Sequence, residues 1–210
     1  MKLSKIYSIY KHKKKLNDNK KRKIIDLIKE ENYDSIIASA SFKVISEYLD
    51  IAVKSQKLYL FTLENKKELI GYALLAKKPK YLFSEFSSLR IKLFLNLIFK
   101  IKLLSIMNLV ISFTDIDKIF LNKRNIFIIQ NNLNLNLLAI KKKYQSKGIG
   151  YYFMKKIIYK EKKNKNNSYI TCETFSPDAV RFYTKKLKFK VLGKKIRFFK
   201  KMLVLSLKIK

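Results

Sequence analysis

Two glycines separated by one residue stand between a strand-like run and a helix-like run of this chain. The stretch Gln145–Gly150, QSKGIG, follows the apolar run 136–140 and precedes the amphipathic run 151–163. Glycines at a strand-to-helix turn let the backbone approach a ligand closely, and the unpaired N–H groups of the first helical turn attract anions. Lys147 adds a mobile positive charge. The turn therefore suits a phosphate or pyrophosphate, although glycine also marks turns that bind nothing.

Other glycine-rich ligand loops fit this turn less well. A P-loop needs Gly-x-x-x-x-Gly-Lys-Ser/Thr, which the stretch lacks. A dinucleotide-binding fold needs a third glycine where Phe153 stands. Both are set aside.

A second motif follows the first. Residues 176–183 read SPDAVRFY, and Leu187-Lys188-Phe189 comes shortly afterwards. In order and spacing the two stretches resemble motifs A and B of the GNAT superfamily of acyl-CoA-dependent N-acyltransferases. Motif A there is Gln/Arg-x-x-Gly-x-Gly/Ala, and motif B is usually Asn-x-x-Ala-x-x-x-Tyr followed by Leu-Gly-Phe. The resemblance is specific from about residue 135 onward and extends, less diagnostically, over about residues 20–207.

The resemblance implies acetyl-CoA as co-substrate and assigns residues to it. Backbone N–H groups of the strand before the loop would hydrogen-bond the acyl carbonyl and the pantetheine arm, the loop and the start of the helix would take the pyrophosphate, and Ser176 would lie on the cofactor side. These cofactor-binding candidates are Leu138, Ala139, Ile140, Gln145, Ser146, Lys147, Gly148, Ile149, Gly150, Tyr151 and Ser176. Tyr183 matches the family's tyrosine that often protonates the leaving thiolate, although a packed aromatic also suits that position.

The general base is not marked by the motifs. The acidic residue that the family often has near the start of the motif A strand is replaced here by Asn134, and Glu173 is the nearest carboxylate by motif position. A water chain, or an amine that is already neutral when bound, would serve as well. Ser176 in place of Asn and Lys188 in place of Gly are two further departures from motif B.

Composition limits the classes of protein. The chain has 210 residues, enough for one domain spanning 1–210 with an insertion at about 81–110. Its formal net charge is +33, but only five of its 48 basic residues are arginine, the residue that base-reading surfaces favour. Nucleic acid is therefore not the expected main partner, and the charge would instead attract phosphates or an anionic substrate.

Cys172 and His12 are the only cysteine and histidine. No intrachain disulfide can form, and no zinc site or Cys/His catalytic pair is expected, so no metal cofactor is predicted. The lysine-rich N-terminus does not read as a secretory signal, which makes the cytoplasm the expected compartment. Lysine and arginine interrupt the insertion at 81–110 too often for a transmembrane helix, so it is a lid, a helix at a membrane surface, or a helical cap on the sheet.

Hydrophobic periodicity and the resemblance together predict the fold. Residues 11–23 read as a solvated connector, a helix is expected over 34–51, and the runs 57–64 and 68–76 form a hairpin. The expected fold is mixed α/β, with a largely antiparallel central sheet, helices on both faces, and a splayed strand pair beside the strand that ends at Ile140.

The expected function is transfer of an acetyl group from acetyl-CoA to a primary amine by direct attack. The acceptor is an amino sugar in glycan assembly, a small amine or a protein amine. The insertion resembles one in GNAT members encoded with surface-polysaccharide genes, which favours the sugar. Its basic, apolar composition also allows peripheral membrane contact through 81–110. A non-catalytic acyl-CoA-binding module and a basic protein that binds nucleic acid or a membrane surface are the alternatives. The oligomeric state stays open.

Overall fold

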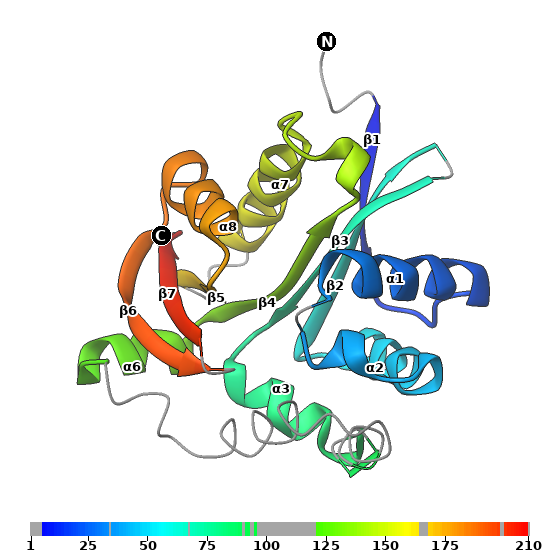
Figure 1. The fold of residues 1–210 in the computed structure, drawn as a ribbon, viewed down its shortest axis with the longest axis horizontal. Helices are drawn as coiled ribbons and strands as arrows, with labels where there is room; N and C mark the ends of the chain where they lie inside the picture. The colour runs from blue at the N-terminus through cyan, green and yellow to red at the C-terminus, as the bar shows by residue number, and fades with distance from the viewer. Residues whose placement is uncertain are drawn as a thin grey trace.

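A seven-stranded sheet forms the centre of the protein, in a computed structural model that describes residues 6–33, 35–66, 68–89, 91–92, 95, 121–163, 168–197 and 200–209. The strand order is β1-β2-β3-β4-β5-β7-β6 (Figure 1). All neighbouring strands are antiparallel except β4 and β5, which are parallel. The predicted mixed α/β fold with a largely antiparallel sheet is confirmed.

The strands are β1 (Tyr7–His12), β2 (Leu58–Asn65), β3 (Glu68–Ala76), β4 (Leu133–Ile140), β5 (Tyr169–Thr174), β6 (Lys190–Arg197) and β7 (Lys200–Lys208). The longer helices are α1 (Asp18–Glu31), α2 (Phe42–Lys54), α3 (Pro79–Glu85), α6 (Lys123–Asn131) and α7 (Ile149–Lys163). Shorter turns are η2 (Ile37–Ser39), η4 (Lys142–Tyr144), α8 (Pro177–Arg181) and the π-helical η5 (Phe182–Lys186).

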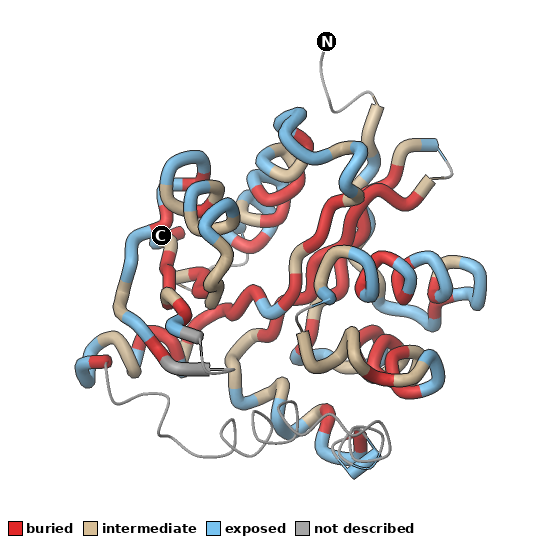
Figure 2. Tube along the Cα trace, viewed as in Figure 1, coloured by how far each residue is buried: buried red, intermediate tan, exposed pale blue. Residues whose placement is uncertain are grey.

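Helices cover both faces of the sheet, and each face has its own apolar core. The helices α1 and α2 pack on one face through residues such as Ile24, Ile28 and Leu49. On the other face, α7 and the α8–η5 segment pack through Phe153 and Leu187. The central strands are buried and the outer sides of the helices are exposed (Figure 2). The central sheet is therefore buried on both faces and separates the two apolar cores.

Two helix boundaries differ from those predicted. The Asn17 side chain accepts a hydrogen bond from Lys20 N, so α1 begins at Asp18 and takes up half of the predicted connector. The helix predicted over 34–51 begins only at Phe42, because the Ser41 side chain caps it by accepting from Val44 N. In both cases a local polar cap outweighed the apolar periodicity.

A β-bulge divides β4 into two halves that face different cores. The pairing with β3 skips Asn136, since Leu74 pairs with Leu137 and Leu75 with Leu135. Leu135 packs in the core under α7, whereas Leu137 packs in the core under α1 and α2. Regular alternation would keep both on one face, so the extra residue reverses the facing of the second half of β4.

The second half of β4 also leaves its neighbour β5. The two strands pair over Leu133–Leu135 and Ile170–Cys172 and then diverge (Figure 1), as expected for the splayed pair. On its other edge β4 stays bonded to β3 as far as Ile140. Gly71 permits this close approach, because a Cβ there would lie 2.7 Å from Ala139 O. The pairing of the sheet is therefore interrupted between β4 and β5 beyond their paired residues, a break in the hydrogen bonding that we call the gap.

The expected insertion at about 81–110 lies only in part within the described residues. Its described start packs on the α1/α2 core: Phe86 and Leu89 are buried there, and Phe86 stacks on Tyr48 at a ring-centroid distance of 4.1 Å. Lys92 is ion-paired with Glu47 of α2 at 2.7 Å. Within the described ranges, none of the helices combines the length and the apolar character needed to cross a bilayer.

Candidate functional site

The gap between β4 and β5 is lined on one edge by backbone groups of β4. Lys141 N donates to Ile70 O of β3. In an antiparallel pair the backbone N–H and C=O groups of every second residue point to the same neighbouring strand, so those of Ala139 also point to β3. The backbone groups of Leu138 and Ile140 therefore point to the gap. Side chains reach the carbonyls on that edge: Asn32 Nδ2 lies 3.5 Å from Leu138 O, and Gln145 Nε2 lies 2.7 Å from Ile140 O. Of the three strand candidates, Leu138 and Ile140 turn their backbone to the gap, and Ala139 does not.

The glycine-rich turn leads from the end of β4 into α7. Tyr152 N is bonded to Gly148 O at 3.0 Å, so the N–H groups of Ile149, Gly150 and Tyr151 precede the first helical hydrogen bond. Gly148 has φ +76° and open space around the position of a Cβ. Ser146 has φ +60°, a left-handed conformation that is uncommon outside glycine. The turn thus presents a row of N–H groups at a helix N-terminus, with the exposed Lys147 beside it.

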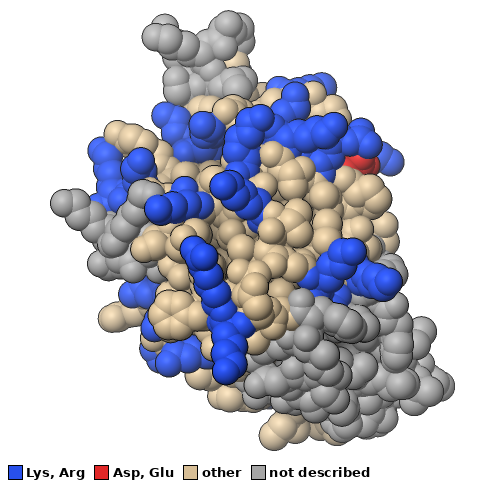
Figure 3. Space-filling view, turned by 90° about the vertical axis from the view of Figure 1, so that its left-hand side faces the viewer, with Lys and Arg blue, Asp and Glu red and all other residues tan. Residues whose placement is uncertain are grey.

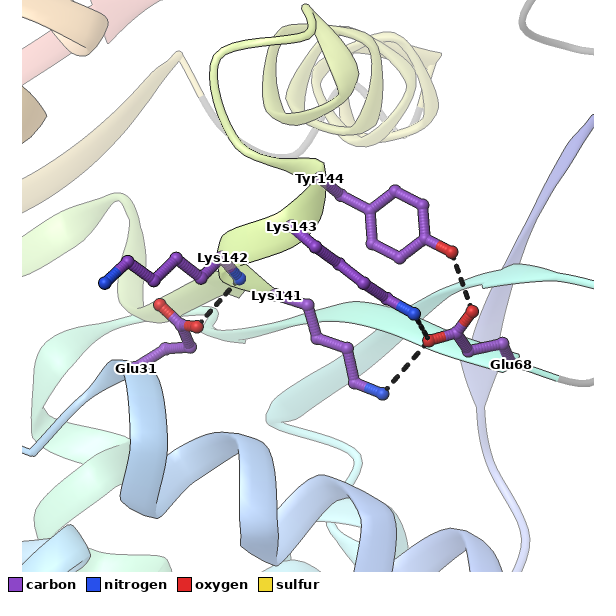
Figure 4. Close-up of polar contacts among 6 residues, drawn as sticks. All are labelled: Glu31, Glu68, Lys141, Lys142, Lys143 and Tyr144. Atoms are coloured by element: carbon purple, nitrogen blue, oxygen red, sulfur yellow. Dashed lines mark hydrogen bonds and ion pairs between the residues drawn. The ribbon is translucent and has the colours of Figure 1, made fainter.

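Gln145 is exposed, but its side chain is hydrogen-bonded within the protein. Besides Ile140 O, its Nε2 donates to Glu31 Oε2 at 2.7 Å, and its backbone N donates to Lys142 O. Glu31 Oε1 accepts from Lys142 N at 2.8 Å (Figure 4). The C-terminal end of α1 is therefore tied to the turn, and Gln145 fixes the path of the chain from β4 into the loop. The sequence did not single out Glu31, because it lies more than a hundred residues away in the chain.

Glu68 gathers three side chains of the segment before the loop. Lys143 Nζ lies 2.8 Å and Lys141 Nζ 3.3 Å from Glu68 Oε1, and Tyr144 OH donates to Oε2 at 2.7 Å (Figure 4). The hydrogen bond from Lys143, followed by that from Tyr144, lowers the pKa of Glu68 to about 2. The lysines at 141 and 143 are thus paired on the β3 side, whereas the side chain of Lys142 extends away from Glu68 (Figure 4).

Tyr183 lies on η5, directly after α8, on the same face of the sheet as α7. Its ring is buried between Phe182 and Phe189, with centroid distances of 5.2 and 5.3 Å. Burial raises the pKa of the Tyr183 hydroxyl well above its usual value, so the group keeps its proton at neutral pH. In the part of the chain that the structure describes, no residue hydrogen-bonds this hydroxyl. Phe182 lies 3.7 Å from the position of a Cβ on Gly150, so η5 borders the glycine-rich turn.

Ser176 is the N-cap of α8: its Oγ accepts from Ala179 N at 3.4 Å. Its side chain therefore has a structural partner where the family's motif has asparagine. Lys188, at the position of the glycine in Leu-Gly-Phe, has φ +63°. The left-handed backbone that glycine adopts readily is thus kept here by a lysine.

Glu173 projects to the other face of the sheet. Along β5, Ile170 and Cys172 belong to the core under α7, so the alternating positions Thr171 and Glu173 face away from it. Glu173 Oε1 accepts from the nearly buried Lys195 Nζ at 2.8 Å. Tyr183 and Glu173, the two catalytic candidates, therefore lie on opposite sides of the sheet.

Further polar side chains lie beside β4 on the α1/α2 side of the sheet, and of these the sequence singled out only Asn134. Asn136, the bulge residue, donates from Nδ2 to Tyr48 OH at 3.2 Å. Tyr72 OH donates to Asn32 Oδ1. Asn134, which stands where the family often has an acid, donates to Thr171 Oγ1 at 3.3 Å. Only the strand register and the bulge bring the other residues together, so no local signal could have shown that Asn136 meets Tyr48 or that Tyr72 meets Asn32. Within the described ranges, no three His, Cys, Asp or Glu side chains form a metal-binding group.

Comparisons with known proteins agree with this geometry. Residues 125–202 match the family model of the acetyltransferase (GNAT) domain. By sequence, no curated protein matches the chain.

Several solved structures share the fold over nearly the whole chain. A chimera of the spermidine N-acetyltransferase SpeG from Vibrio cholerae and hSSAT has a TM-score of 0.59 and 15% identity, covering 97% of this chain and 95% of its own. A GNAT-family protein from Desulfovibrio desulfuricans has a TM-score of 0.58 and 10% identity, with 97% and 99% covered. The ribosomal-protein-S18-alanine N-acetyltransferase from Escherichia coli has a TM-score of 0.54 and 11% identity, with 98% and 95% covered. Residues 125–202, which contain the glycine-rich turn and the second motif, thus resemble the acetyltransferase (GNAT) domain, and the fold of nearly the whole chain is similar to that of solved N-acetyltransferases.

Proposed function

We propose that the protein, as one domain over residues 1–210, transfers the acetyl group of acetyl-CoA to the amine of an anionic amino sugar. The observation that carries the cofactor part is the gap beside β4. There the backbone of Leu138 and Ile140 faces the opening, and the glycine-rich turn follows directly. An extended thioester arm bonded to that backbone would bring its pyrophosphate to the N-terminus of α7.

The two sides of the sheet suit the two reactants. The cofactor lies on the side of α7 and Tyr183, and the amine comes from the side of Asn136, Tyr48 and Asn32. The amine nitrogen attacks the thioester carbon while N–H groups of β4 stabilise the developing oxyanion. The carbon–sulfur bond then breaks, and the thiolate takes the proton of the Tyr183 hydroxyl. Burial keeps the Tyr183 hydroxyl protonated at neutral pH, so the proton that the thiolate requires is present there, although the same burial makes the hydroxyl a weaker acid.

The amine must also lose a proton. Glu173 lies on the acceptor side of the sheet, but its Oε1 already accepts from Lys195 Nζ at 2.8 Å. Glu173 therefore acts in this proposal through a bridging water, or the amine binds already neutral and loses its proton to solvent.

The positive net charge of the chain favours an anionic acceptor. A protein with a formal net charge of +33 repels a polycation such as spermidine and attracts an acceptor that carries phosphate. A nucleotide-linked amino sugar combines the required amine with such phosphates. A protein amine and a small polyamine, the acceptors named for two of the structural neighbours, are the competing classes.

Calorimetric titration with acetyl-CoA tests the cofactor site. Gly148→Asp and Gly148→Asn form a matched pair, because Asp and Asn both tolerate the left-handed backbone and differ only in charge. We expect Gly148→Asp to bind acetyl-CoA at least about tenfold more weakly than Gly148→Asn, since it places a carboxylate among the phosphate-binding N–H groups. Equal affinities in the two folded variants would contradict the site.

Release of CoA thiol tests the reaction and the acceptor. The wild type is assayed with a nucleotide-linked amino sugar, spermidine and an N-terminal alanine peptide at equal concentrations. We expect the sugar nucleotide to give the highest kcat/KM. Preference for spermidine or the peptide would overturn the acceptor class but not the activity. Tight acetyl-CoA binding without turnover of any acceptor would favour the non-catalytic acyl-CoA-binding module.

A further inference from the structure

A groove lies on the back of the segment that carries Tyr183. It has a volume of about 440 Å³ and runs between α8–η5 and β7. The lining consists of Phe175, Pro177, Val180, Arg181, Thr184, Lys185, Lys201 and Leu203. Tyr183 and Phe182 point from the same segment toward α7, as their place in the core under α7 shows. The groove is therefore separate from the gap between β4 and β5.

The groove combines an apolar floor with a cationic rim. Leu203 and Val180 are half-buried, whereas Arg181, Lys185 and Lys201 are exposed. None of these three cations forms an ion pair with another described residue, in contrast to Lys195, which is bonded to Glu173. Lysine and arginine side chains gather over the side of the molecule that presents α8, β6 and β7, with one small acidic patch at its edge (Figure 3). Charge complementarity therefore calls for an anionic occupant.

The apolar floor decides between classes of anionic partner. A phosphate backbone would pair with the rim but leave the floor uncovered, and sequence-independent nucleic-acid grooves use exposed aromatic platforms. A membrane surface is matched by apolar side chains that protrude, not by a concave floor. An acidic peptide with an apolar side chain between its carboxylates fills both parts, since the side chain covers Leu203 and Val180 while the carboxylates meet the rim.

We propose that this groove is a docking site for an acidic, apolar-centred segment of a partner protein. The segment binds behind α8 and η5, so a partner is recruited without occupying the gap where acetyl-CoA and the acceptor meet. This site goes beyond the proposed reaction and does not depend on it.

Fluorescence anisotropy of the 210-residue chain tests the site with a defined probe. The probe is a short fluorescein-labelled peptide in which a leucine-phenylalanine pair is flanked by aspartates and glutamates. A second peptide of equal charge carries glycine-serine in place of that pair. We expect the first peptide to bind about tenfold more tightly, because only it covers the apolar floor.

Two double variants, each of which removes two positive charges, distinguish the contribution of the rim lysines from that of the overall positive charge on this side of the molecule. Lys185→Ala with Lys201→Ala removes two rim lysines, and Lys190→Ala with Lys194→Ala removes two exposed lysines of β6 outside the groove. We expect the rim variant to weaken binding of the first peptide about tenfold and the β6 variant to change it by less than about twofold. Val180→Thr, which keeps the shape of the floor but adds a hydroxyl, is expected to weaken it several-fold.

Titration with acetyl-CoA on the same samples shows that each variant is folded. If the wild type failed to bind acetyl-CoA, that result would contradict the proposed function but not the docking site. Equal affinity for the two peptides, or equal losses in the two double variants, would overturn the docking site. Stronger binding of a single-stranded RNA or of anionic vesicles, lost in the rim variant, would overturn the peptide in favour of that partner.

Discussion

Tyr183 stands on a π-helical turn rather than on a regular helix. Leu187 N donates to Phe182 O, five residues back, and Phe189 N donates to Tyr183 O. Such turns cost stability and occur often at functional sites. Here the turn directs the ring of Tyr183 into the core under α7, where burial keeps the hydroxyl protonated.

Replacing Tyr183 with Phe tests whether this residue acts as a catalytic acid or only as a packed aromatic side chain. We expect kcat to fall about a hundredfold or more, while KM for acetyl-CoA changes by less than about twofold. The melting temperature should hardly change, because the hydroxyl has no hydrogen-bond partner among the described residues. Tyr159→Phe, at an exposed position near the end of α7, is the control. Full activity of Tyr183→Phe would assign the residue to packing alone.

Lys188 gives a second prediction for a single residue. Its φ of +63° is costly for a residue with a Cβ and easy for glycine. Lys188→Gly should therefore raise the free energy of unfolding by about 0.5–1 kcal/mol, after the greater entropy of glycine in the unfolded chain is deducted. Lys186→Gly, in the adjacent helical turn, should lower it by about as much. Urea unfolding measures both, and effects of the same sign would contradict the explanation.

At the scale of elements, β4 determines how the site is arranged. Its first half belongs to a continuous sheet, and its second half pairs with β3 alone. The bulge at Asn136 marks the change and turns the following side chains to the opposite face. One inserted residue thus creates both the reversal of facing and a polar position beside Tyr48.

Deletion of Asn136 tests the bulge. Without the extra residue, Leu137 would follow Leu135 directly and still face the α1/α2 core, so the pairing with β3 would become regular. The hydrogen bond of Asn136 to Tyr48 and the bend of the strand would be lost. We therefore expect acetyl-CoA to bind about tenfold more weakly, while the free energy of unfolding falls by only about 1 kcal/mol. Deletion of Lys14, in the exposed connection between β1 and α1, is the control and should change neither quantity much. Unchanged acetyl-CoA affinity after deletion of Asn136, measured by calorimetry, would show that the site does not need the bulge.

At the scale of the whole molecule, the excess of positive charge acts on association more than on the fold. The described acidic groups near the turn are already paired, Glu68 with Lys141 and Lys143 and Glu31 with the backbone of Lys142. The remaining lysines therefore create a positive field that would attract the anionic cofactor of the proposed function.

Ionic strength should reveal that field. We expect the association rate constant of acetyl-CoA, measured by stopped-flow mixing, to fall about tenfold between about 0.05 and 0.5 M salt, while the dissociation rate constant changes much less. Acetyl-dephospho-CoA, which carries fewer negative charges, should show a weaker dependence. Identical salt dependences for the two cofactors would mean that the charge does not guide binding.

The sequence alone determined the features that are local in the chain. The glycine-rich turn, the hairpin of β2 and β3, and the segment from Ser176 to Phe189 follow from apolar spacing, glycine positions and motif order, because each needs only neighbouring residues. The starts of α1 and α2 were also local, but their caps at Asn17 and Ser41 were overlooked in favour of periodicity.

Only the tertiary structure decided how distant residues meet. The contact of Glu31 with the turn, the pairing of Glu68 with two lysines, and the place of Asn136 beside Tyr48 depend on which strands are neighbours and in what register. A single bulge in β4 changes that register, and apolar spacing does not reveal it. The opposite facing of Tyr183 and Glu173 likewise follows from the alternation of β5 within the assembled sheet, since a strand has no inner or outer face until its neighbours cover it.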